Sequence, residues 1–275
     1  MSSVLTFFIR AIFKKAAYLL LVLSAASVQA LEQAQFDELL ADLQAGKLES
    51  VADFLDKNPK LATTDPDYTV LLLNHGFMAN RNSRLIVAQG EPEEGDYELA
   101  SLDDPSVKGF MREQVTFNNE AIIKVIQVAQ KNLKSFPEYL DIHFGIATIA
   151  SGIGEWKIAT EQLVSMLKHS REIDNQWKWG KVGGIDGAPE EFMIQSVLPY
   201  SSELYRLETP ETDQLLIQLS EALIQYYPKK VYGYANLGSF YAVTGKKEKA
   251  REYYQKALEV DPSDQIVKQN IELLN

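Results

Sequence analysis

Residues 231–264 constrain the fold more than any other part of the sequence, and they read VYGYANLGSFYAVTGKKEKAREYYQKALEVDPSD. Apolar side chains recur at helical spacing on both sides of Gly245, so this segment predicts two helices joined by a tight turn. Small residues at Gly238 and Ala250 suit a close crossing of the two helices. The side chains that would fill the space around that crossing are Tyr234, Leu237, Tyr241 and Tyr254, and Ala257 is a further small residue of the second helix. Pro262 would end the second helix.

One helix pair cannot bury its own apolar face, so neighbouring pairs are expected. Pro228 precedes Pro262 by 34 residues, with a helix over 212–227 before it and another over 190–207, in which Pro199 predicts a kink or a break. Pro137 would close a still earlier unit. Counting forward from Pro137 gives a weaker pair, whose positions are occupied by His143, Ile146, Ala147, Gly154, Trp156, Ala159 and Leu163. Residues 264–275 would form a capping helix with a polar outer face.

The length and the eight matching positions of 231–264 resemble the tetratricopeptide repeat (TPR) family. More loosely, the whole chain is similar to bacterial exported TPR-containing proteins, which have no established activity, in its NQWKWG and GAPEEF segments. The resemblance implies a mainly α, TPR-like α-solenoid that binds a protein or peptide in a groove lined by the first helix of each repeat. In this repeat the groove positions would be Tyr232, Ala235, Ser239 and Ala242, and Tyr232 and Ser239 are the candidate partner contacts.

The first thirty residues predict an export signal. Arg10, Lys14 and Lys15 form a basic leader, residues 16–28 are apolar, and Val28-Gln29-Ala30 places small residues where a signal peptidase reads. Cleavage after Ala30 would make Leu31 the new N-terminus and leave no stable membrane insertion. A retained anchor is the alternative. We expect the periplasm of a Gram-negative bacterium, or else secretion or N-terminal anchoring at a membrane.

Residues 31–117 predict an N-terminal helical segment with a small β insert. Two short helices are expected over 32–60 and a third over 65–80, with Asp65 as its N-cap. The stretches 84–88 and 97–102 flank an acidic, turn-rich segment and predict a β-hairpin near 84–102, with a disordered acidic loop as the alternative. TPR-like helical repeats would then occupy 118–275.

Residues 173–188 are too long for an ordinary turn between repeats. This segment, which we call the tryptophan loop, carries Trp177 and Trp179 among four glycines. Tryptophans in a glycine-rich loop suggest a partner-binding surface. The alternative is that both rings fold back and fill the core beside the solenoid.

Composition and motifs favour binding over catalysis. The net charge of -11 disfavours nucleic acid as a partner, and the absence of cysteine excludes disulfides and thiolate sites. His75, His143 and His169 are the only histidines, and they stand in no metal-ligand spacing. We expect a non-enzymatic exported scaffold with no cofactor and no metal.

Two other functions stay open from the sequence. One is a hydrolase-type enzyme with His75, Asp103 and Asp104 between the N-terminal segment and the repeats. The other is self-assembly through the exposed end of the solenoid. The sequence specifies neither the partner nor the oligomeric state.

Overall fold

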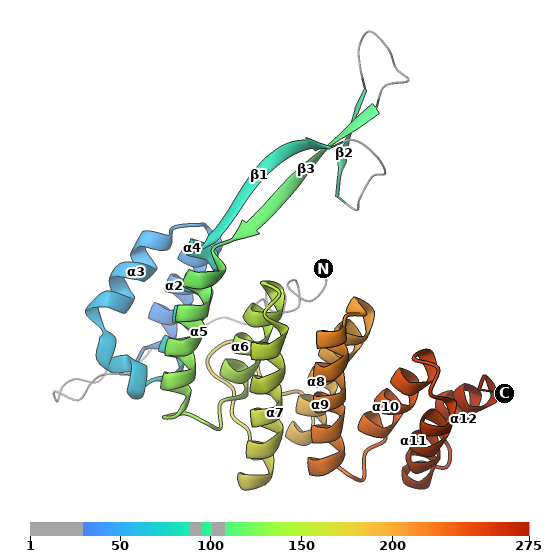
Figure 1. The fold of residues 1–275 in the computed structure, drawn as a ribbon. Helices are drawn as coiled ribbons and strands as arrows, with labels where there is room; N and C mark the ends of the chain where they lie inside the picture. Colours follow the sequence, from blue (N-terminus) through green and yellow to red (C-terminus); the bar gives the residue numbers. More distant parts are fainter. Residues whose placement is uncertain (1–29, 89–94, 101–107, 275) are drawn as a thin grey trace.

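The chain forms a row of helices from which a small β-sheet projects (Figure 1). The structure is a computed structural model that describes residues 30–88, 95–100 and 108–274. In chain order the elements are α2 (Gln33–Gln44), α3 (Leu48–Lys57), the 3-10 helix η1 (Pro59–Thr63), α4 (Pro66–Ala79), β1 (Arg81–Ala88), β2 (Tyr97–Ala100), β3 (Lys108–Phe117), α5 (Asn119–Leu133), α6 (Leu140–Gly152), α7 (Trp156–Glu172), α8 (Pro189–Leu207), α9 (Pro210–Tyr226), α10 (Tyr232–Val243), α11 (Lys247–Val260) and α12 (Gln265–Glu272).

Successive helices pack as pairs: α4 with α5, α6 with α7, α8 with α9, and α10 with α11. The pairs follow one another from the N-terminal helices to α12, which gives the mainly α, TPR-like solenoid that the sequence predicted (Figure 1). The expected boundary between residues 117 and 118 falls between α4 and α5. These two helices pack against each other across it.

The pair α10 and α11 is the repeat identified in the sequence, and its predicted packing is confirmed. A Cβ placed on Gly238 would lie 2.5 Å from ring carbons of Tyr254, so only glycine allows this crossing. Gly245 has a φ of +75°, which lets the chain turn within a few residues. Ala250, Tyr254 and Ala257 are buried as expected.

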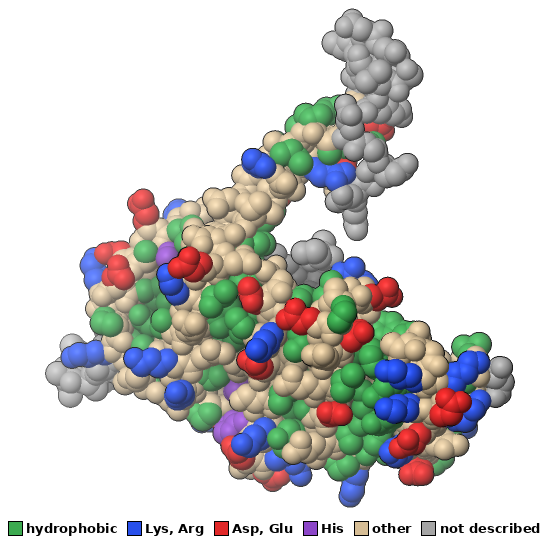
Figure 2. Space-filling view, in the orientation of Figure 1, with side chains coloured by type: hydrophobic (Ala, Val, Ile, Leu, Met, Phe, Trp, Pro, Cys, Tyr) green, Lys and Arg blue, Asp and Glu red, His purple; other side chains and the backbone are tan. Residues whose placement is uncertain are grey.

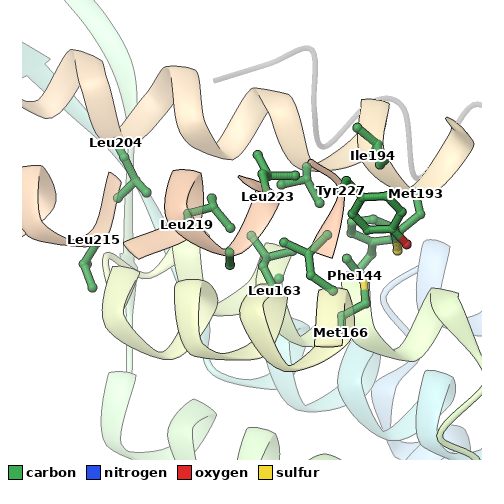
Figure 3. Close-up of a cluster of buried hydrophobic side chains, with 14 of the residues drawn as sticks. Phe144, Leu163, Met166, Met193, Ile194, Leu204, Leu215, Leu219, Leu223 and Tyr227 are labelled. Atoms are coloured by element: carbon green, nitrogen blue, oxygen red, sulfur yellow. The ribbon is translucent and has the colours of Figure 1, made fainter. Parts of the chain in front are cut away.

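The largest core lies among α6, α7, α8 and α9. Figure 3 shows Leu163 and Met166 of α7 facing Leu219 and Leu223 of α9, with Phe144 and Met193 close by. These side chains are almost entirely buried. Pro199 lies inside α8, which runs unbroken from residue 189 to residue 207, so of the predicted kink or break the break is wrong.

The N-terminal helices form where the sequence predicted them, and they bury a core of their own that includes Leu31, Phe36 and Leu71. Asp65 is the N-cap of α4, and its side chain accepts a hydrogen bond from the backbone nitrogen of Asp67. Helix α4 ends at the first strand of the sheet. Helix α4 therefore belongs to this N-terminal core and also packs against α5 and α6.

The sheet corrects the predicted hairpin. Its strand order is β1-β3-β2, both pairings are antiparallel, and β1 does not pair with β2. The central strand β3 was missed from the sequence, because residues 108–117 mix charged and apolar side chains without the alternation that predicts a strand. The sheet takes the place of the turn between α4 and α5.

The end of the solenoid also differs in part from expectation. Val267 of α12 and Leu274 just after it are buried against the last repeat, whereas Ile266 is 71% exposed and Leu273 is 82% exposed. The outer face is polar at Gln265, Gln269 and Glu272, as predicted, with these two apolar side chains among them. Within the described ranges, the helices are all too short or too polar to cross a membrane.

Candidate partner-binding surfaces

The tryptophan loop folds back on the helices. Trp177 is 6% exposed and belongs to the core of α6 to α9, with its ring edge-on to the rings of His143 and His169 at centroid distances of 5.4 Å and 5.9 Å. Its indole nitrogen is buried and meets no hydrogen-bond acceptor in the described part of the chain. Trp177 therefore fills the core, which was the alternative to partner binding, and offers no surface to a partner.

Trp179 is half-buried and also serves the fold. Its indole nitrogen donates to the carbonyl oxygen of Val182, and its ring packs edge-on against Phe192 of α8 at 5.5 Å. Val182 in turn packs against the N-terminal core. The tryptophan loop therefore joins the N-terminal helices to the repeats.

Two buried carboxylates hold this loop in place. The backbone nitrogen of Lys181 donates to Asp67 Oδ1 at 2.8 Å, and its ammonium group lies 2.6 Å from Asp67 Oδ2. The backbone nitrogen of Gly180 donates to Asp141 Oδ2 at 3.1 Å. A Cβ on Gly180 would collide with both carboxylates, so the glycine permits this approach.

Asp65 extends these contacts into a group of four charged residues, which we call the charge cluster: Asp65, Asp67, Asp141 and Lys181. The Lys181 ammonium lies 3.8 Å from Asp65 Oδ2, and the same oxygen accepts a hydrogen bond from the backbone nitrogen of Leu31 at 2.7 Å. The three aspartates are 2%, 3% and 6% exposed. Burial raises the pKa of Asp141 to about 7, and the charge of Asp67 acts in the same direction.

Sequence reasoning missed this cluster. From the sequence, Asp65 was predicted only as the N-cap of a helix, and the partners of Asp67 lie far away along the chain. No local pattern joins Asp67 to Lys181, which follows it by 114 residues. The only local hint of the charge cluster in the sequence is the pair of aspartates on either side of Pro66, at the start of a predicted helix.

The predicted groove residues of the last repeat are engaged inside the chain. The hydroxyl of Tyr232 accepts from Gln195 Nε2 at 2.6 Å and donates to Glu191 Oε1 at 3.2 Å. The ammonium of Lys230 lies 2.6 Å from Glu191 Oε2 and, with the other hydrogen-bond donors there, lowers the pKa of that carboxyl group. Ser239 Oγ accepts a hydrogen bond from the Tyr254 hydroxyl at 3.1 Å. Both candidates are half-buried.

His143 is buried, whereas His75 is half-buried. His143 donates from Nε2 to the Pro137 carbonyl oxygen at 2.9 Å and accepts at Nδ1 from Gln162 at 2.8 Å. Burial lowers the pKa of His143 to about 4, so the ring is neutral and structural. Burial also lowers the pKa of His75, which is half-buried on α4. Asp103 and Asp104, its proposed companions, lie outside the described residues.

In the described ranges, no three His, Cys, Asp or Glu side chains are placed together to hold an ion. Of the three residues in the hydrolase hypothesis, only His75 lies in the described part of the chain. The structure therefore does not show an acid and a base brought together there.

The β-sheet leaves several large apolar side chains exposed close together. We call β1, β2 and β3 the β-arm, which Figure 1 shows extending away from the helices. Leu85 is 65% exposed, Val87 71%, and Tyr97 68%. The strand register places Val87, Met111 and Tyr97 side by side across the three strands. These residues, with Leu85 and the 36% exposed Leu99, form one face, which we call the apolar arm face.

The remaining side chains of the β-arm are largely polar. On the opposite face Arg84 Nε donates to Gln114 Oε1 at 2.8 Å, and Arg112 forms an ion pair with Asp96. Nearer the helices, Arg81 pairs with Glu113 at 2.9 Å on the same side as the apolar arm face. Figure 2 shows hydrophobic side chains on the outer part of the β-arm, beyond the polar base. The apolar arm face is therefore a bounded patch.

Comparison with known proteins agrees with the repeat. The family described as "Tetratricopeptide repeat" matches residues 231–264. A solved structure titled "Crystal structure of MamA protein" is 19% identical over 55% of this chain and 69% of that chain, with a TM-score of 0.33. That similarity is too low to support an argument about function. No curated protein matches this chain.

Proposed function

We propose that this chain is an exported, non-enzymatic scaffold that binds a protein partner through the apolar arm face. The helical array would hold the β-arm, and cleavage after Ala30 would release the chain into the periplasm. The observation that carries the proposal is the exposure of Leu85, Val87 and Tyr97 together on one face.

Exposed apolar patches rimmed by polar residues mark interaction sites, since soluble proteins rarely leave such surface in water. An aromatic residue such as Tyr97 adds rigid contact area, which is enriched where partners bind. Strand β1 also stands at an edge of the sheet, so its outer backbone groups could pair with an added strand. These features favour an extended partner segment with apolar side chains at alternate positions.

The groove of the last repeat is the weaker surface. Tyr232 and Ser239 already bond to Gln195, Glu191 and Tyr254, so a partner would have to replace those contacts. Desolvating and rearranging bonded polar groups subtracts from affinity. The apolar arm face requires no such exchange.

Export is supported by the leader itself. Its basic start, its apolar core and the small residues before Leu31 match a secretory signal. Without the first thirty residues, 24 basic and 38 acidic side chains remain, a net charge of -14. Such a surface repels anionic lipid and nucleic acid, which favours a protein as the partner.

Site-specific photocrosslinking in intact cells tests the proposal. A crosslinking side chain at Val87 should give a discrete adduct, whereas the same group at Arg84, on the opposite face of the same strand, should give little. Replacing Tyr97 with Ser should weaken the Val87 adduct. Crosslinks from Tyr232 or Ser239 in place of Val87 would move the binding surface to the groove. An adduct with the mass of two chains would favour self-assembly, and no adduct from any position would contradict the scaffold.

A further inference from the structure

The residue after the expected cleavage point is buried against a carboxylate. Leu31 is 3% exposed and its side chain packs in the N-terminal core, while the preceding residue, Ala30, is exposed. The Leu31 nitrogen lies 2.7 Å from Asp65 Oδ2, and Asp65 is 2% exposed. The Ala30–Leu31 peptide bond thus joins an exposed residue to a buried one.

The charge cluster holds more acid than base. Three buried carboxyl groups share one described ammonium group, that of Lys181, which lies nearer to Asp67 than to Asp65. A buried carboxylate is costly without a paired charge. Lys181 lies closest to Asp67, and the Leu31 nitrogen stands beside Asp65, so a further cation at that nitrogen would meet a buried carboxyl group.

We propose that cleavage after Ala30 creates this cation: the α-ammonium group of Leu31 forms a buried ion pair with Asp65 and locks the N-terminal helices onto α4. The inference rests on the export and cleavage proposed above. It goes beyond them, because processing would then stabilise the fold as well as release the chain.

The chemistry of the step is hydrolysis by the signal peptidase of the export machinery. The water oxygen joins the Ala30 carbonyl carbon, and the leader leaves as a carboxylate. Both water hydrogens end on the Leu31 nitrogen, which changes from an amide to an ammonium group. A single neutral donor beside Asp65 becomes a positive charge with three donors, at the same place in the chain.

Protection of the Leu31 amine is the first test. The full chain is expressed with its leader in a Gram-negative host, the processed protein is purified, and its N-terminus is sequenced. An amine-acetylating reagent at neutral pH should label Leu31 on the order of tenfold or more slowly than it labels the Asp65→Asn variant, because the buried amine reacts only when the segment opens. Asparagine can still cap α4, so this variant keeps the cap and removes the charge.

Asp264→Asn is the matched control. Asp264 caps α12 through a bond to the Val267 nitrogen, far along the chain from Leu31, so its variant should leave the labelling rate unchanged. A second variant keeps Asp65 and places one glycine between Ala30 and Leu31, so that the ammonium group is displaced by one residue. Its Tm should fall by roughly 5 °C or more, as expected when a buried charge loses its partner. If Asp65→Asn does not fold, the glycine variant alone tests the ion pair between Leu31 and Asp65.

The outcomes separate this inference from the proposed function. An N-terminus other than Leu31, or a Leu31 amine that reacts equally fast in the processed protein and in Asp65→Asn, overturns the ion pair. An unchanged Tm in the glycine variant overturns it as well. None of these readouts depends on a partner, so failure of the Val87 crosslink would leave this inference standing, and the reverse also holds.

Discussion

Asp141 is buried in the first turn of α6, and its ionisation is costly there. One of its oxygens accepts from Gly180, while the other, Oδ1, has no partner among the described residues. Because the folded-state pKa is raised to about 7 from the usual 3.8, the folded protein holds a proton that the unfolded chain has lost. The contribution of Asp141 to stability therefore falls as the pH rises from about 4 to about 7.

The Asp141→Asn variant should not show this fall. We expect its free energy of unfolding to rise relative to wild type by up to about 4 kcal/mol between pH 4 and pH 8, since one pKa unit corresponds to about 1.4 kcal/mol. Urea unfolding across this pH range measures the difference. Parallel curves for the two proteins would contradict the raised pKa.

The buried His143 changes the stability with pH in the direction opposite to Asp141. Its folded-state pKa is lowered to about 4 from 6.5, so it contributes stability that is lost as the pH falls from 6.5 towards 4. The two buried groups oppose each other in wild type over this range. In the Asp141→Asn variant, the free energy of unfolding should therefore rise as the pH rises from 4 towards 6.5, because only the contribution of His143 remains.

At the scale of elements, the tryptophan loop acts as a brace between α4 and α6. The backbone of Lys181 and its ammonium group both bind Asp67 on α4, and Gly180 binds Asp141 on α6. Lys178, three residues earlier, pairs with Glu138 in a much more exposed position. The two lysines therefore offer a matched comparison within one loop.

Lys181→Met should destabilise the protein by about 2–4 kcal/mol, because it leaves the buried Asp67 carboxylate without its ion pair. Lys178→Met should cost less than about 1 kcal/mol, as is usual for exposed pairs. Urea unfolding at neutral pH measures both. Equal costs for the two variants would mean that the brace does not depend on the charge of Lys181.

The elements also show how far the sequence predicts this structure. The last repeat followed from local spacing, because Gly238, Gly245 and Pro262 each act on residues near them in the chain. The cap at Asp65 was local for the same reason. Strand β3 was missed because its pairing depends on strands up to 36 residues away, which composition does not reveal. The bonds of Asp67 and Asp141 to the tryptophan loop span 114 and 39 residues, so only the fold brings them together.

At the scale of the whole molecule, the β-arm and the helical array are joined over a short length. The Asn118 nitrogen donates to the Asn80 carbonyl oxygen at 2.9 Å, so the two ends of the β-arm lie side by side. Next to this junction the rings of Phe77 and Phe117 stack, with their centroids 5.1 Å apart. On the helical side of the junction, α4 packs against α5.

Replacing residues 82–116 with a two-residue Asn-Gly turn should therefore leave the array folded. Arg81 and Phe117 are paired across the two strands, which is the spacing that such a turn closes. We expect helical circular dichroism to persist and the Tm to stay within about 3 °C of wild type, because few contacts of the array are removed. The Val87-dependent crosslink would be lost with the β-arm. A collapse of helical signal would show that the sheet is part of the folding core.

The junction at Asn80 and Asn118 has a consequence for how such chains diversify. A turn between two packed helices tolerates length changes, since only its ends are fixed. Sequence drift or insertion at this point would alter the recognition surface while the buried packing of α4 on α5 stayed constant. The same position is thus a natural grafting point, where a different hairpin would give the scaffold a new specificity without redesign of its core.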